Sequence, residues 1–286
     1  MANLKEIRNR ITSVSSTMQI TSAMKMVSAA KLKKAQDAIT AMRPYADKLT
    51  ELLQNLSATL DEDSGSKFSE QRQLKKVLIV AITSNRGLCG AFNSNIIKAV
   101  SKRATTTYAN QEVSYVTIGK KANDAFKRTD AVIADKSPVF DDLSYDNVAD
   151  IAEMLMEQFM SGDFDRIEII YNKFKNAATQ EVMTEQFLPI KPVDGDDNLT
   201  ADYIFEPSKL EIVDELIPKS LKTQLYKAIR DSFASEHGAR MTAMHKATDN
   251  ATELRDQLKL TYNKARQAAI TNEILEIVGG ADALSN

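Results

Sequence analysis

Hydrophobic positions in the last third of the chain repeat with the period of a coiled coil. Residues 207–284 are mostly strong helix formers, interrupted by Pro218, Gly238 and the Gly279-Gly280 pair. A helix of that span would be roughly 110 Å long, far longer than an ordinary globular helix. The apolar and small seam residues, spaced about 3.5 residues apart as in a left-handed coiled coil, are Met241, Met244, Thr248, Ala251, Leu254, Leu258, Tyr262, Ala265 and Ala269. This narrow, partly polar seam requires a packing partner.

The first sixty residues offer that partner. Their apolar residues also step by three and four, with a phase slip predicted through Ile20, Met24 and Val27. The seam consists of Leu4, Ile7, Ile11, Val14 and Met18 before the slip, and Leu32, Ala35, Ile39, Met42, Ala46, Leu49, Leu53, Leu56 and Leu60 after it. Pro44 should kink this helix, because it cannot donate to the carbonyl of Thr40. The pattern predicts an antiparallel coiled coil of the two chain ends; two unrelated long helices in a bundle are the alternative.

Between the two helices, strand and helix patterns alternate. Short β-branched or apolar runs predict strands at 77–82, 113–118, 131–134 and 166–171, with an extended segment at 178–188. Helices are expected at 91–108, 120–127 and 147–160. This alternation predicts a Rossmann-like α/β domain with a mainly parallel sheet. We therefore divide the chain into an N-terminal coiled-coil helix (1–60), a linker (61–75), an α/β domain (76–206) and a C-terminal coiled-coil helix (207–286).

A glycine-bearing turn after the first strand is the one candidate for a nucleotide site. It reads Gly87-x-x-Gly90, which lacks both the dinucleotide fingerprint and the lysine of a phosphate loop. A tight turn before a helix is favoured, and a coiled-coil adaptor with a nucleotide-binding head remains the alternative function.

Other candidate chemistry is weaker. Cys89 makes a poor case as a nucleophile, and His237 and His245 lack companion ligands for a metal. A calcium loop opening at Asp194 would need glutamate where Phe205 stands. We therefore expect no catalytic residue, no metal and no bound cofactor.

Charge and cysteine content limit the classes of binding partner and the cellular compartments that fit this sequence. Residues 1–48 hold nine Lys and Arg against three Asp and Glu, whereas the middle of the chain is net acidic. A nucleic-acid-binding rod is possible on charge, but no aromatic residue precedes Tyr45 to stack on bases, so a protein partner with acidic loops is favoured. The single cysteine, Cys89, suits a reducing compartment. No run approaches a membrane span, and no signal or transit segment is recognised, which favours a bacterial or already mature protein.

Several sequence blocks resemble one family. The block Ile270–Ala283 (ITNEILEIVGGADA) looks like the C-terminal signature of the gamma subunit of F-type ATP synthase. The blocks Lys5–Ile11 and Ile20–Val27 resemble that family's opening helix, and Ser235–Met241 and Tyr262–Gln267 are further family-like blocks. The resemblance runs in order from Met1 to Leu284. It implies a non-catalytic rotor of the central stalk, carrying torque between the proton-driven c-ring and the catalytic hexamer of alpha and beta subunits.

The resemblance also implies partners and contact residues. The expected partners are the alpha, beta and epsilon subunits and the c-ring, with the protein peripheral to the cytoplasmic face of a bacterial plasma membrane. Contacts with beta-subunit loops, which are acidic in the family, would come from Met24, Lys25, Arg240, Arg266, Gln267, Thr271 and Glu273. An apolar tip would sit in a sleeve formed by the hexamer and comprises Ile274, Leu275, Ile277, Val278 and Leu284. Tyr203 and Glu206 would be contacts of the foot with the c-ring.

Overall fold

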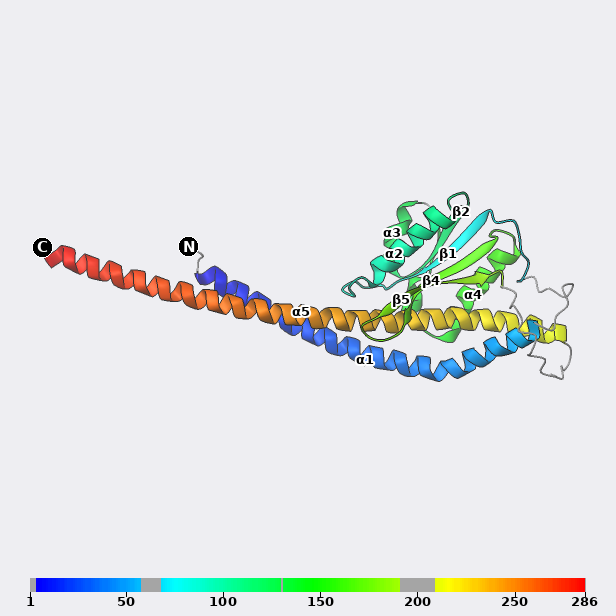
Figure 1. Ribbon diagram of the computed structural model, residues 1–286, viewed down its shortest axis with the longest axis horizontal. Helices are drawn as coiled ribbons and strands as arrows, with labels where there is room; N and C mark the ends of the chain where they lie inside the picture. The colour runs from blue at the N-terminus through cyan, green and yellow to red at the C-terminus, as the bar shows by residue number, and fades with distance from the viewer. Residues whose placement is uncertain (1–3, 58–67, 130, 191–208, 286) are drawn as a thin grey trace. The chain divides into compact units, whose positions relative to one another are not determined.

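The computed structural model describes residues 4–57, 68–129, 131–190 and 209–285. It divides into two compact units: a shaft unit (Met1–Ser28 with Met241–Asn286) and a head unit (Ala29–Arg240). Two long helices, α1 (Leu4–Ser57) and α5 (Lys209–Ser285), each contribute to both units (Figure 1). The predicted division of the chain into four parts stays a prediction. The two compact units have other boundaries, because each long helix is divided between them.

The two helices of the shaft unit run antiparallel, as predicted. Three contacts between them establish this direction: Arg8 with Tyr262, Thr21 with Thr248, and Lys25 with His245. Residue numbers rise along α1 as they fall along α5, which requires opposite chain directions. The Arg8 guanidinium donates to the Tyr262 hydroxyl at 2.7 Å and lies over its ring. The Thr21 and Thr248 hydroxyl oxygens are 2.8 Å apart.

The predicted phase slip in α1 is wrong, because the seam continues without a break. Ile20 and Val27 are 60% and 57% exposed, whereas Thr21 and Ser28 are buried. The buried or half-buried residues Met18, Thr21, Lys25, Ser28 and Leu32 keep the three-and-four steps of a coiled coil. Hydroxyl side chains fit there because each donates to a carbonyl of its own helix: Thr21 to Met18, and Ser28 to Met24.

The predicted seam of α5 is confirmed over most of its length. Met244 and Ala251 are buried, and Tyr262 and Ala265 are half-buried. The exceptions are Ala269, which is exposed, and Leu254, which is 44% exposed. Its neighbour Arg255 is half-buried instead, and donates to the Met18 sulfur at 3.5 Å. The long aliphatic part of an arginine can cover apolar surface while its charged end stays near water.

In the head unit, α1 remains helical through Pro44, and Figure 1 shows it changing direction in this second half. A proline inside a helix removes one backbone hydrogen bond and commonly produces such a bend. The buried side chains of this half continue the predicted seam at Leu32, Ala35, Ile39, Ala46 and Leu49.

A five-stranded sheet forms the centre of the head unit, in the order β3-β2-β1-β4-β5. The first four strands are parallel, and β5 is antiparallel to β4, so the mainly parallel prediction is confirmed. The strands are β1 (Lys76–Ile82), β2 (Glu112–Ile118), β3 (Val132–Asp135), β4 (Arg166–Phe174) and β5 (Gln180–Leu188). Residues 77–82 are fully buried, as expected for a strand covered on both faces.

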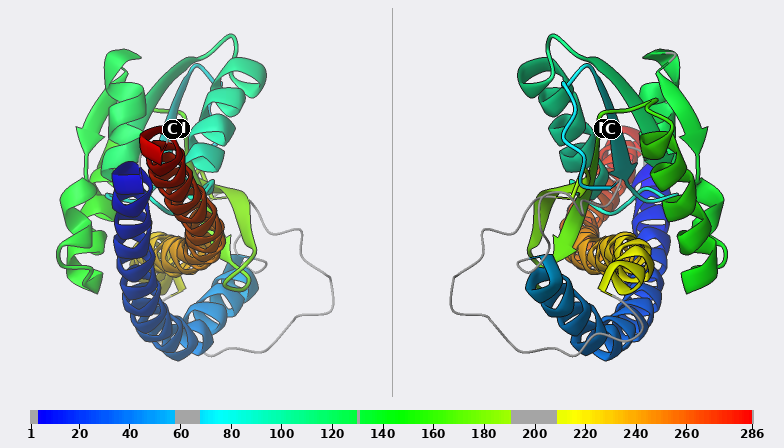
Figure 2. Two further views of the ribbon diagram at one scale, coloured as in Figure 1. Left: turned by 90° about the vertical axis from the view of Figure 1, so that its left-hand side faces the viewer. Right: turned by 90° about the vertical axis from the view of Figure 1, so that its right-hand side faces the viewer.

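Helices cover both faces of this sheet (Figures 1 and 2). One core packs α2 (Phe92–Lys102) and α3 (Lys120–Phe126) against the first face. The other core joins α4 (Tyr145–Met160) to the part of α5 between Ile217 and Ile229. A short π-helix (Arg103–Thr107) and 3-10 turns (Lys127–Thr129, Ser137–Phe140) complete the unit. The long C-terminal helix is therefore part of the head's own core as well as of the shaft.

Gly238 has a packing role in α5. A Cβ atom at this position would lie 3.2 Å from the Cα of Ala177 and 3.3 Å from its carbonyl oxygen, in the turn between β4 and β5. Glycine costs a helix about 1 kcal/mol relative to alanine, and here it permits this hairpin to approach the helix backbone closely. A Cβ atom at Gly279, by contrast, would have no such neighbour within 4 Å.

The hydroxyl pair at the centre of the shaft yields a test of the antiparallel register. Thr21→Val and Thr248→Val should each lower the free energy of unfolding by about 0.5–1 kcal/mol, because each leaves a buried or half-buried hydroxyl without its cross-helix partner. The double variant should lose less than the sum of the two, as measured by denaturant unfolding in a double-mutant cycle. Thr12, which bonds only within its own helix, is the control. Thr12→Val should combine additively with Thr248→Val, and equal coupling in both pairs would contradict the register.

Candidate functional site

The turn after β1 lies at a special place in the sheet. The strand order places β2 and β4 on opposite sides of β1, and the helices that follow β1 and precede β4 lie on opposite faces. In open α/β sheets, the carboxyl ends of two such strands border the crevice where ligands bind. The turn 83–93 therefore stands where a nucleotide site would form if the chain had one.

The turn uses its own polar groups. Asn93 accepts a hydrogen bond from the Ser84 backbone amide at 2.9 Å, and the Ser84 hydroxyl donates to the Arg86 carbonyl at 2.6 Å. The Asn93 amide also donates to the Cys89 sulfur at 3.1 Å. Leu88 and Gly90 both have φ near +60°, which turns the chain sharply. The Ser84 amide, which could otherwise bind a phosphate, is thus occupied within the turn, and the geometry favours the tight-turn interpretation over a nucleotide site.

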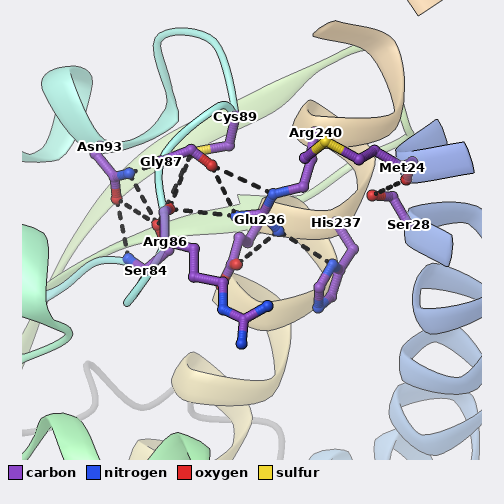
Figure 3. Close-up of polar contacts among 10 residues, drawn as sticks. All are labelled: Met24, Ser28, Ser84, Arg86, Gly87, Cys89, Asn93, Glu236, His237 and Arg240. Carbon is purple, nitrogen blue, oxygen red and sulfur yellow. Dashed lines mark hydrogen bonds and ion pairs between the residues drawn. The ribbon is translucent and has the colours of Figure 1, made fainter. Parts of the chain in front are cut away.

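The side chain that reaches this turn comes from α5. Arg240 is 7% exposed, and each of its three guanidinium nitrogens makes a polar contact (Figure 3). Nε donates to the Gly87 carbonyl at 3.4 Å, and Nη2 donates to the Arg86 and Gly87 carbonyls at 3.2 and 3.3 Å. Nη1 lies 2.7 Å from the Glu236 carboxylate and 3.2 Å from His237 Nδ1. A buried cation is thereby matched by one anion and two backbone carbonyls.

Burial controls the protonation of the groups around Arg240. Burial raises the pKa of the Glu236 carboxyl, and the adjacent Arg240 opposes that rise. Burial, with the positive charges of Arg240 and Lys31, lowers the pKa of His237 to about 3, so this imidazole stays neutral at physiological pH. Burial also raises the pKa of the Cys89 thiol, which argues against the nucleophile considered from the sequence.

The predicted partner-contact residues fall into separate groups. Met24 and Lys25 are half-buried on α1, where the Lys25 amine lies 3.3 Å from His245. Arg240 is buried in the head unit. Arg266, Gln267, Thr271 and Glu273 are exposed on α5. Tyr203 and Glu206 lie outside the described residues. Their predicted roles as contacts stay predictions.

The apolar tip of α5 is exposed. Ile270, Ile274, Leu275, Ile277 and Val278 are each between 48% and 66% exposed. They follow Tyr262, which accepts a hydrogen bond from Arg8 near the start of α1, and every residue from Arg266 to Ala281 is exposed. Leu284 lies in the helix, but its side chain is outside the described part. A group of large exposed apolar side chains on one helix is of the kind that marks an interaction site.

Sequence reasoning missed the contact between Arg240 and the turn after β1. It considered His237 only as a metal ligand and did not single out Glu236, Ser84 or Asn93. The available signal was an acidic and a basic residue four positions apart, Glu236 and Arg240, on a stretch where α5 is otherwise small and apolar.

Two properties of the described ranges bear on function. In 4–57, 68–129, 131–190 and 209–285, no helix combines the length and apolar character needed to cross a bilayer. Nor, among these residues, do three His, Cys, Asp or Glu side chains gather as metal ligands.

Two long helices form an antiparallel coiled coil and also contribute to a Rossmann-like α/β unit. This architecture defines the class of coiled-coil proteins with an inserted α/β domain. The family model described as ATP synthase matches residues 3–284. The ATP synthase gamma chain of Flavobacterium psychrophilum is 76% identical over 285 residues, covering 99% of both chains. That of a Geobacter species is 46% identical, again covering 99% of both. The chain therefore belongs to the ATP synthase gamma chain family.

Solved structures agree with this assignment. A chain in the central stalk and c-ring structure of the Tetrahymena thermophila mitochondrial ATP synthase matches with a TM-score of 0.60 and 26% identity, over 80% of this chain and 99% of that one. A chain of the Euglena gracilis mitochondrial ATP synthase shares the fold, with a TM-score of 0.68 and 23% identity, over 98% of this chain and 94% of that one.

The lowered pKa of His237 predicts a pH dependence of stability. Unfolding restores the ordinary pKa of 6.5, so below that pH the unfolded chain binds a proton that the folded chain does not. Folded-state stability attributable to His237 should therefore fall as the pH decreases from 6.5, by at most about 1.4 kcal/mol per pH unit. Glu236 acts in the opposite sense, since burial raises its pKa.

The measurement is denaturant unfolding between pH 7 and pH 5 of the unmodified chain and of His237→Asn. The variant should lose less stability on acidification, because asparagine accepts from Arg240 without titrating. His245→Asn, at the other histidine of the sequence, whose side chain is 57% exposed, is the comparison variant. Equal slopes in all three proteins would contradict the assignment.

Proposed function

We propose that this chain is the rotating central shaft of an F-type ATP synthase. Its family membership supports this, as does its similarity to a central-stalk structure at 26% identity. The observation that carries the proposal is the tip of α5, which continues beyond its pairing with α1 and exposes a run of large apolar side chains. Such a tip requires a surrounding apolar sleeve, which a ring of alternating alpha and beta subunits would form.

The shaft would act by binding its partners unequally. A partner changes shape only to the extent that a ligand binds its conformations with different free energies. Two paired helices with a single free tip have no rotational symmetry, so the shaft presents a different surface to each subunit around it. Rotation driven by proton flow through the c-ring would alter the catalytic sites in turn, and ATP hydrolysis would drive the reverse rotation.

We further propose that the chain contributes no catalytic group and binds no cofactor of its own. The turn at the usual ligand crevice has its polar groups engaged by the chain itself, which supports a non-catalytic role. The protein would be peripheral, on the cytoplasmic face of a bacterial inner membrane, with epsilon as a further partner beside alpha, beta and the c-ring.

The contact residues are those that the family resemblance implies, and exposure supports four of them. Arg266, Gln267, Thr271 and Glu273 are exposed on α5 just before the apolar tip and would meet beta-subunit loops. Met24 and Lys25 would do so from α1. Ile274, Leu275, Ile277, Val278 and Leu284 would fill the sleeve, and Tyr203 and Glu206 would meet the c-ring.

Arg266→Ala and Gln267→Ala test the proposal. Both side chains are exposed, so each variant should fold normally while losing coupling at the interface. Membranes carrying the variant enzyme should pump several-fold fewer protons per ATP hydrolysed, or retain less assembled enzyme, because removing a hot-spot arginine commonly costs about 2 kcal/mol of binding.

Lys259→Ala supplies the matched control, as an exposed cation on the same helix within the paired region. It should leave assembly and the ratio of pumping to hydrolysis unchanged. Normal pumping and assembly in both Arg266→Ala and Gln267→Ala would contradict the contact assignment.

A further inference from the structure

The crevice at the carboxyl end of β1 is filled by a group from the same chain. Two backbone carbonyls, of Arg86 and Gly87, face the guanidinium of Arg240, and the Glu236 carboxylate balances its charge (Figure 3). A phosphate site presents amide hydrogens to an anion. This crevice has the opposite polarity, because it presents carbonyl oxygens to a cation.

We infer that this crevice is a guanidinium socket, in which Arg240 is the positioning residue that holds the turn 84–93 against α5. The contact itself can be tested without reference to the rotary role. It adds to the other connections between the sheet and α5, which include the apolar core between Ile217 and Ile229 and the approach of the β4–β5 hairpin to Gly238.

The shape of the socket selects arginine over lysine. Three separate nitrogens of Arg240 serve acceptors that come from two elements: the turn after β1, and α5 itself through Glu236 and His237. A planar guanidinium presents five donors in a fixed fork, whereas an ammonium is a single point with three donors. Lysine could therefore keep the ion pair with Glu236 but could not also reach both carbonyls in the same geometry.

Cys89 provides a direct reporter of this contact. Its side chain is 2% exposed and packs with Phe92 and with Ala239, the residue next to Arg240. It is the single cysteine of the sequence. A thiol reagent can reach it only when the turn separates from α5, so the labelling rate measures that local opening.

The experiment compares labelling of Cys89 by an aromatic disulfide reagent in the full-length chain and its variants under native conditions. Arg240→Ala should label about tenfold faster or more, since the socket loses a buried charge-assisted contact. Arg240→Lys should fall between the two. Arg230→Ala is the matched control: Arg230 also extends from α5 to a head carbonyl, that of Leu143, at 2.7 Å. Its loss should leave the labelling rate near that of the unmodified chain.

Chemical rescue separates a socket from a general loss of stability. Guanidinium ions at millimolar concentration should slow the labelling of Arg240→Ala back toward the original rate, because they fit the vacated space between Glu236 and the carbonyls. Equal concentrations of urea or sodium chloride should not. The same ions should leave Arg230→Ala unaffected.

Several outcomes would overturn the inference. These are unchanged labelling in Arg240→Ala, equal acceleration in Arg230→Ala, or rescue by urea and sodium chloride as effective as rescue by guanidinium. If Arg240→Ala does not fold, Glu236→Gln carries the test, since it keeps the arginine and weakens the balancing charge. Faster labelling in Glu236→Gln would then support the socket, and unchanged labelling would count against it. None of these results depends on coupling in the assembled enzyme, so failure of the socket and failure of the rotary proposal are distinguishable.

Discussion

The structure depends on the burial of one narrow seam between the two ends of the chain. Neither helix could persist alone in water at this length on propensity, because most helical stability in proteins comes from packing of an apolar face. The seam is made of small and medium side chains with hydroxyls at Thr21, Ser28 and Thr248. Such a seam gains little from hydrophobic burial per residue. Its polar positions restrict the register instead, as single polar residues do in other coiled coils.

The head unit applies a second constraint to the same helix. The apolar residues between Ile217 and Ile229 join α5 to one face of the sheet, and Gly238 permits the β4–β5 hairpin to approach closely. Three different kinds of contact, apolar, steric and ionic, thus succeed one another along about six turns of α5. Each kind would resist a different displacement: burial resists separation, close packing resists sliding, and the fork of Arg240 resists rotation of the helix about its axis.

Much of this fold could be predicted from sequence, because the signals are local. The strands at 77–82 and 113–118 and the seam from Met244 to Ala265 follow from residue type and spacing within short windows. The false phase slip has a physical cause. Ile20 and Val27 are more apolar than Thr21 and Ser28, yet hydroxyls that bond to their own helix can enter a seam where a partner is close. Counting apolar residues cannot detect this.

The contacts of the candidate site could not be predicted from the sequence in the same way. The contact of Arg240 with Arg86 and Gly87 joins positions more than 150 residues apart in sequence, and no local pattern encodes that proximity. The glycine-bearing turn lacks a nucleotide fingerprint in the sequence. That the Arg240 side chain contacts this turn could be found only from the fold, which places α5 beside it. The roles expected of Arg266, Gln267 and the apolar tip rest on the family resemblance, and their exposure is not revealed by spacing alone.

The free end of α5 has one further consequence. Starting a helix is unfavourable because several dihedral angles must be ordered for the first hydrogen bond, whereas each later residue adds a bond at small cost. The residues after Arg266 do not have to start one, because they extend a helix already formed against α1. The paired region therefore acts as a template for the tip, so the exposed end of α5 is presented as a helix that was nucleated elsewhere.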